Sequence, residues 1–139
     1  IKQDNTGLNE PNSVKIHTMK EYNAANNNAL ESGIARNVIF VADSANHRIV
    51  SLLEPDLQGV YPEDANYGPD TLCYAGQFGK TYKIMRNNEG CNEPRDIHIF
   101  NAYDSDDEAA DGKNPSVYAM VADYGNHREL LMRLYLVRA

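Results

Sequence analysis

Stretches of strand length, apolar or alternating in character, recur along the chain and are separated by polar, turn-forming residues. Two alternating stretches, Ser13–His17 and Asp96–Phe100, follow Pro11 and Pro94. Because proline cannot donate to a sheet ladder, each strand is expected to begin just past its proline. Two runs of β-branched and aromatic residues predict strands that are buried on both faces. These runs are Asn37–Val41 and Ser116–Val121.

Each buried strand is followed by a tight turn and a further strand. The turns, Ser44–Asn46 and Tyr124–Asn126, contain residues that tolerate the left-handed conformation, and Asn is the residue that suits it. The later strands are expected at Arg48–Leu53, Glu129–Leu136 and Thr71–Gly76, the last ending in the turn signal Gly76-Gln77-Phe78-Gly79. One unit therefore reads as a four-stranded antiparallel sheet.

An eight-residue string occurs twice in the chain. Val41–Arg48 reads VADSANHR and Val121–Arg128 reads VADYGNHR, so six of eight residues match at an offset of 80. Upstream, Asn9-Glu10-Pro11 recurs as Asn92-Glu93-Pro94 at an offset of 83. The same order at nearly equal offsets indicates an internal duplication. We therefore divide the chain into a first repeat, residues 1–90, and a second repeat, residues 91–139, which lacks a last strand within the chain.

The duplicated strings resemble the NHL repeat of β-propellers, a family named for its Asn-His-Leu signature. Both copies keep Asn-His, followed by Arg48 or Arg128, and the resemblance covers nearly the whole chain apart from its loops. It implies an all-β fold of two four-stranded antiparallel blades, part of a larger or assembled propeller of roughly four to eight blades. Two blades cannot close such a ring. The expected partners are therefore the remaining blades of the same protein or other copies of this chain.

The duplicated string also carries the candidate site. An Asp before a tight turn can accept backbone N–H groups of that turn, and an Arg four to five residues later can hold the same carboxylate. One such set in each repeat favours a device that builds the blade over a single active centre. The residues are Asp43, Asn46, His47, Arg48, Asp123, Asn126, His127 and Arg128.

Charge and composition exclude two classes of partner. The net charge is -7 and no cluster of Lys and Arg stands out, which argues against nucleic acid. No apolar run approaches the roughly 20 residues that span a bilayer, so no membrane span is expected. The connections at Thr18–Arg36, Pro55–Asp70 and Asn101–Pro115 are long, and loops of such length are usually functional or disordered.

The two cysteines bracket the connection between the repeats. A Cys73–Cys91 disulfide would stabilise the fold by about 3 kcal/mol. It would also imply an oxidising compartment, so an extracellular or secreted location is expected. The alternative is that Cys91 is a buried free thiol, because Leu8 holds the same place in the first repeat.

Two metals come into consideration. The amidating lyases that process peptidyl-hydroxyglycine are NHL-like zinc enzymes, in which a ligand His tends to follow the proline of the first strand. Asn12 and Arg95 stand at that position here, so no zinc centre is expected from His17, His47, His98 and His127.

The acidic run contains weak calcium candidates. The alternative is that this run is a solvated loop, and Ala109 stands where an EF-hand needs Gly. The candidates are Asp104, Asp106 and Asp107.

The sequence thus favours a protein-interaction or structural assembly module over an enzyme, with calcium as the one candidate cofactor. The alternative is a part of a propeller enzyme of the amidating-lyase type. A fold alone does not decide between them.

Overall fold

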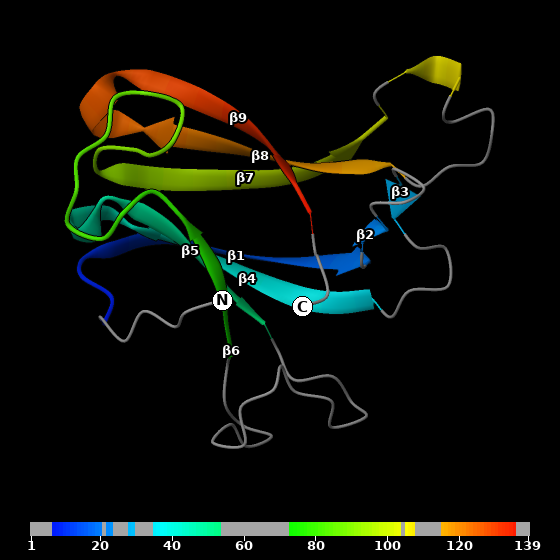
Figure 1. The fold of residues 1–139 in the computed structure, drawn as a ribbon, viewed down its shortest axis with the longest axis horizontal. Helices are drawn as coiled ribbons and strands as arrows, with labels where there is room; N and C mark the ends of the chain where they lie inside the picture. Colours follow the sequence, from blue (N-terminus) through cyan, green and yellow to red (C-terminus); the bar gives the residue numbers. More distant parts are fainter. Residues whose placement is uncertain are drawn as a thin grey trace.

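The computed structural model of the chain describes residues 7–20, 22–23, 28–29, 35–53, 73–103, 105–107 and 115–135. The fold of these residues is all-β and is built from two antiparallel sheets that lie one on the other (Figure 1). The first sheet has the strand order β1-β4-β5-β6, and the second has the order β7-β8-β9. Within the described residues, no helix is long and apolar enough to cross a membrane.

The strands lie where the hydrophobic pattern predicts them. The first sheet contains β1 (Pro11–Lys20), β4 (Ala35–Asp43), β5 (Arg48–Leu53) and β6 (Cys73–Phe78). The second contains β7 (Pro94–Ala102), β8 (Ser116–Asp123) and β9 (Arg128–Leu134). Single 3-10 turns, η1 (Ser44–Asn46) and η2 (Tyr124–Asn126), follow β4 and β8.

Several details differ from the expectation. Strands β1 and β7 include their prolines, β1 continues to Lys20 although a loop was expected from Thr18, and β9 ends at Leu134 and not at Leu136. The loop between β1 and β4 contains a small hairpin of two-residue strands, β2 (Tyr22–Asn23) and β3 (Asn28–Ala29). Strand β6 does not end at Gly76 but continues to Phe78, and the turn begins at Gly79 with φ 91°. A Cβ at Gly79 would lie 2.8 Å from the carbonyl oxygen of His47, so close approach as well as backbone conformation favours glycine there.

The two repeats share one strand register. Val14 pairs with Val41 in the first sheet, and Ile97 pairs with Val121 in the second. Both first strands also shift register just after their proline. The register therefore defines counterparts, residues at equivalent positions in the two sheets. The two offsets of the duplication differ because the connection between first and second strands is three residues longer in the first repeat.

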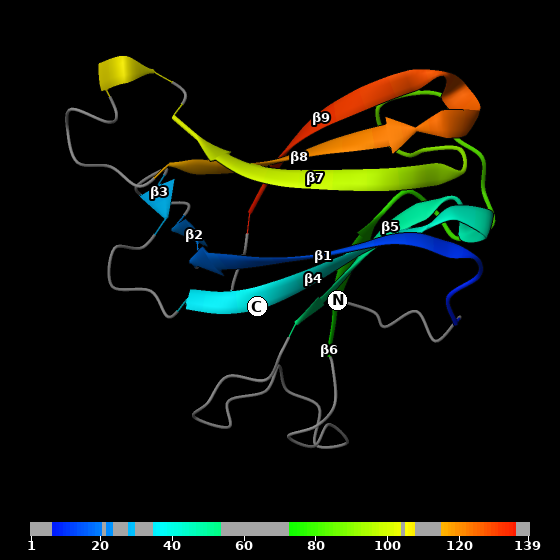
Figure 2. The same cartoon turned by 180° about the vertical axis from the view of Figure 1, so that it is seen from behind.

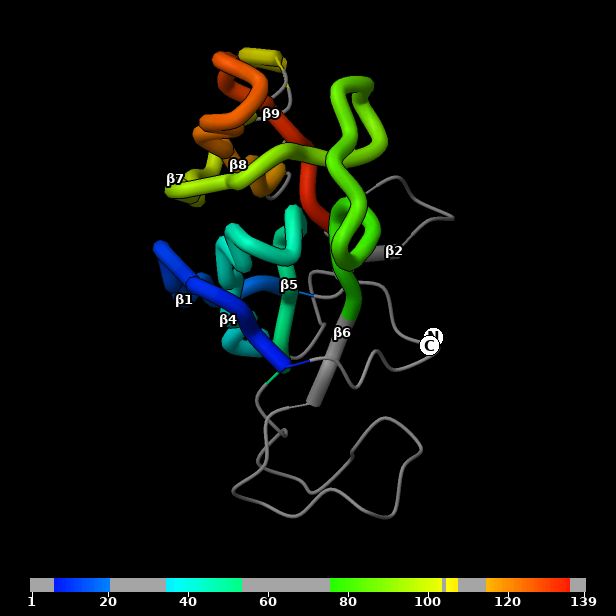
Figure 3. The backbone as a smooth tube through the Cα atoms, turned by 90° about the vertical axis from the view of Figure 1, so that its left-hand side faces the viewer, coloured from blue at the N-terminus to red at the C-terminus, as the bar shows by residue number. Residues whose placement is uncertain are grey.

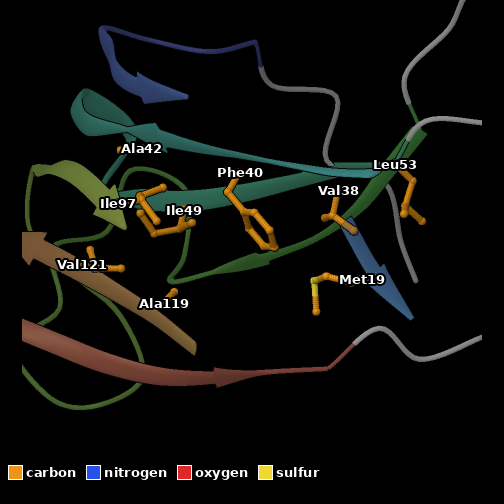
Figure 4. Close-up of a cluster of buried hydrophobic side chains, with 9 residues drawn as sticks. All are labelled: Met19, Val38, Phe40, Ala42, Ile49, Leu53, Ile97, Ala119 and Val121. Carbon is orange, nitrogen blue, oxygen red and sulfur yellow. The ribbon is translucent and has the colours of Figure 1, made fainter. Parts of the chain in front are cut away.

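The hydrophobic core lies between the two sheets, where one face of the first sheet packs against the opposite kind of face of the second sheet. Because side chains alternate along a strand, each sheet has two faces. We call the face of the first sheet that carries Val38, Phe40 and Ala42 its forward face, and the face of the second sheet that carries Ile97, Ala119 and Val121 its rear face. Figure 4 shows these side chains pointing toward one another. Met19, Ile49 and Leu53 complete the buried cluster from the forward side.

Strands β1 and β7 lie side by side, and the other strands of each sheet follow outward in the same order (Figures 2 and 3). Polar contacts join the pair. Ser13 Oγ donates to Asp96 Oδ1 at 2.9 Å, and His17 Nε2 lies 2.9 Å from Asn101 Oδ1. The hydroxyl of Ser13, and then the backbone N–H of Ile97, lower the pKa of Asp96 below its ordinary value. These two hydrogen bonds thus favour the ionised form of Asp96, although its side chain is exposed.

Candidate functional site: the repeated turns and the open sheet faces

The first turn is organised around a buried carboxylate. Asp43 Oδ1 accepts the backbone N–H of Asn9 at 2.6 Å. Its Oδ2 accepts Asn46 Nδ2 at 2.8 Å and Arg48 Nε at 2.7 Å. Asn46 Nδ2 also donates to the carbonyl oxygen of Gly7 at 3.0 Å. Asp43 therefore joins the turn to the segment before β1, as well as to its own arginine.

The second turn repeats this network. Asp123 Oδ1 accepts the backbone N–H of Asn92 at 2.7 Å. Its Oδ2 accepts Asn126 Nδ2 and Arg128 Nε, both at 2.8 Å. Asn126 Nδ2 also donates to the carbonyl oxygen of Met85 at 2.7 Å. Both oxygens of each carboxylate are occupied by donors of the chain, an arrangement that fixes the turn and leaves the aspartate poorly placed to act as a base.

The left-handed residue of each turn is a histidine, so the expectation that Asn46 and Asn126 hold that conformation is wrong. His47 has φ 56° and His127 has φ 55°, and each follows a 3-10 turn. The asparagines stay within the 3-10 turns, where their amides bridge the aspartate and a carbonyl. The expectation that the aspartate accepts an N–H of its own turn is also wrong, because its backbone donor comes from the segment before the first strand.

The first turn contacts the second repeat at three points. The backbone N–H of Glu93 donates to His47 Nδ1 at 3.1 Å, and Cys91 Sγ donates to the carbonyl oxygen of His47 at 3.4 Å. Ser44 Oγ donates to the carbonyl oxygen of Pro94. The first turn is therefore part of the interface between the repeats.

The two arginines at equivalent positions, Arg48 and Arg128, differ in solvent exposure. Arg48 donates to Gln77 Oε1 of β6 and to Thr81 Oγ1 of the connection between β6 and β7, and its side chain is 2% exposed. Arg128 donates to the carbonyl oxygens of Asn87 and Gly90, and its side chain is 25% exposed. Around the second turn lies an open, shallow depression. It is lined by Arg86, Gly125, Asn126, His127 and Arg128.

The predicted Cys73–Cys91 disulfide is not formed, and the register gives the reason. Cys73 pairs with Leu53 at the far end of β5, whereas Cys91 lies beside His47 at the near end. The two ends of β5 are five residue steps apart, about 17 Å, and a disulfide needs Cα atoms within roughly 7 Å. Cys91 is a buried free thiol, which was the alternative to the disulfide in the sequence analysis. Its burial raises the pKa of the thiol to about 12.

The histidines and acidic residues do not gather. His17 bonds to Asn101, His98 stacks on Phe100, and the other two lie in separate turns. No group of three or more His, Cys, Asp or Glu able to hold one metal ion occurs in the part of the chain that is described. Of the calcium candidates, Asp106 and Asp107 are exposed, and Asp104 lies outside the described residues.

Sequence reasoning missed the residues that complete the turns. Glu10 and Glu93 both adopt positive φ, 52° and 48°, a conformation that is uncommon for a residue with a side chain. The signal was present, since both belong to the tripeptide that recurs upstream of each turn. Ser44 was not singled out either, and Tyr124 replaces it in the second repeat, where the Arg95 guanidinium lies 3.6 Å from the centre of its ring.

Each sheet also has a face that is open in part. The rear face of the first sheet exposes Val14 and Ile16 on β1, although Val41 and Val50 on the same face are buried, and the forward face of the second sheet exposes Leu131. Phe100 stacks between His98 and Tyr118 on that same forward face. Exposed apolar side chains gathered on one face are a common feature of interaction surfaces.

Comparisons of the chain with protein-family models, with curated proteins and with solved structures find no match.

Proposed function

We propose that this chain is a segment of an NHL-type β-propeller that works as a protein-interaction or structural assembly module. The observation that carries the proposal is the packing of the two sheets. The forward face of one repeat covers the rear face of the next, so part of one face of each kind stays open, with Val14 and Ile16 on one and Leu131 on the other. Repeats that stack in this manner present their terminal faces to further repeats or to other polypeptides.

The chemistry of the turns supports the same proposal. The aspartates, asparagines and arginines of the duplicated string bond to one another and to backbone carbonyls. The same set occurs once in each repeat. A network used twice for the same purpose supports a structural role for these residues, as the sequence had suggested.

The alternative is that the segment belongs to a propeller enzyme of the amidating-lyase type. Such an enzyme would hold zinc, and a zinc content close to one ion per chain would favour it. The extracellular location rested on the disulfide, which the structure does not form, and it stays a prediction.

Solution mass and metal content test the proposal together. Purified without chelators and studied between 1 and 100 µM (about the range in which transient interfaces assemble), the chain should have a mass above 15.6 kDa that rises with concentration. Zinc should remain far below one ion per chain. A stable 15.6 kDa monomer with one zinc ion would contradict the module and support the enzyme.

A further inference from the structure

The two open faces are the unpaired halves of the interface that joins the repeats. On the rear faces, Ile97 is 1% exposed in the interface, whereas its counterpart Val14 is 58% exposed. On the forward faces, the first sheet buries Val38, Phe40 and Ala42. Their counterparts on the second sheet are half-buried: Tyr118, Met120 and Ala122. Val41 and Val50 on the rear face of the first sheet are already buried, so the open part of that face is β1. This part is equivalent to β7 in the observed interface, and the open forward face is equivalent to the face that covers β7.

The turns show the same relation. In the observed interface, Cys91 and Glu93 contact the two acceptor atoms of His47. The counterparts of Cys91 and Glu93 are Leu8 and Glu10. Cys91 is fully buried, but Leu8 is 48% exposed, and Glu10 is exposed with the same left-handed backbone as Glu93. Leu8 and Glu10, just before β1, could therefore make the same contact with a histidine of another turn.

The other side of the contact is open at the second turn. His127 has the same backbone conformation as His47 and is exposed. It lines the shallow depression beside Arg86 and Arg128. A segment equivalent to residues 91–94 would reach His127 there, and residues 8–11 are such a segment.

Two positions set the open faces apart from the closed ones. On β9, Glu129 and Arg133 stand where β5 has Ile49 and Leu53, two members of the buried cluster, so the open forward face is more polar than the closed one. At the turn, Tyr124 replaces Ser44 and is larger than the residue that bonds to Pro94. Both changes are expected to make the open interface weaker than the closed one, because two apolar residues of the buried cluster are replaced by charged ones.

From these matches we infer that copies of this chain associate head to tail. The rear face of the first sheet in one copy, with Leu8 and Glu10, covers the forward face of the second sheet in the next copy, with His127. The inference rests on the proposed function and names its partner. Unlike faces meet, so the contact is heterologous, and it closes a ring or extends a filament according to the rotation between copies.

Paired variants test this polarity by sedimentation velocity. Ile16→Glu blocks the rear face and Leu131→Glu blocks the forward face; both positions are exposed, so each variant should keep the wild-type circular dichroism spectrum. Each variant alone should raise the concentration of half-assembly about tenfold or more, because each copy must bury a charge. Ile84→Glu, the same change at an exposed position in the β6–β7 connection, should leave assembly unchanged.

An equimolar mixture of Ile16→Glu and Leu131→Glu should form one dimer, of twice the 15.6 kDa chain mass, because one intact face of each kind remains. Tyr124→Ser should strengthen wild-type assembly by restoring the residue of the closed turn. If the mixture stays monomeric, or if either single variant assembles as the wild type does, the head-to-tail contact is wrong. The proposal that the chain is an assembly module would then still hold. If the wild type itself is monomeric, both proposals fail.

Discussion

The two turns have the same signature and the same internal hydrogen bonds, yet one is closed and the other open. Asp43 and Asp123 each accept three donors from equivalent residues. The arginine is 2% exposed in the first turn and 25% exposed in the second. The signature therefore builds the turn, whereas neighbouring segments of the polypeptide bury it.

The largest expected difference between the turns lies in their arginines. Arg48→Ala should lower the free energy of unfolding by about 3–5 kcal/mol, because it leaves the buried Asp43 carboxylate without its counter-charge. Arg128→Ala should cost about 1–2 kcal/mol, because water can reach Asp123 through the open side. Urea denaturation followed by circular dichroism, at one protein concentration, measures both. Equal losses would show that the two turns are equally closed.

A second comparison concerns the rear faces. Ile97→Ala should cost about 2–5 kcal/mol, because it leaves a cavity between the sheets. Ile16→Ala makes the same change on the open rear face and should stay within about 0.5 kcal/mol at concentrations below assembly. Denaturation at low micromolar protein provides the measurement. A large loss for Ile16→Ala under those conditions would mean that the first sheet already has a cover.

The Cys91 thiol predicts a loss of stability at high pH. Its pKa is raised from 9.0 to about 12 in the folded chain, so the folded state holds the proton more tightly than the unfolded state does. The resulting stabilisation is present below pH 9 and is lost as the pH rises toward 12. Cys91→Ala should flatten the decline in unfolding free energy over this range. An unchanged slope would show that the thiol is not buried.

The smallest effect concerns the contact between β1 and β7. The Ser13 hydroxyl contributes most to the lowered pKa of Asp96, so Ser13→Ala should move that pKa back toward its ordinary value of 3.8. A lowered carboxyl pKa stabilises the fold above the ordinary value, and this contribution fades as the pH falls through the folded pKa. Carboxyl chemical shifts of Asp96 between pH 2 and 7 (about the range in which carboxyls titrate) follow it. If the pKa of Asp96 does not change in Ser13→Ala, the contact between β1 and β7 is not formed in solution.

Sequence reasoning found the strands because β-branched runs and proline starts are local signals, and it found the turn networks because the string is duplicated. It placed Asn46 in the left-handed conformation because of the local propensity of Asn. In the structure Asn46 lies within the 3-10 turn, where its side-chain amide donates to both Asp43 and Gly7. It paired Cys73 with Cys91 because their positions in the sequence do not reveal that a whole strand separates them. Which face of each sheet would be covered depends on contacts between distant segments.

Glu10 is the open counterpart of Glu93, and amide hydrogen exchange of these two residues is the sharpest test of the head-to-tail contact. The Glu93 amide donates to His47, so it should exchange slowly at every protein concentration. The Glu10 amide should exchange rapidly in dilute protein and become protected as the concentration rises and His127 of another copy accepts it. A Glu10 amide that stays unprotected where the mass shows assembly, or that is already protected in the monomer, would contradict the account.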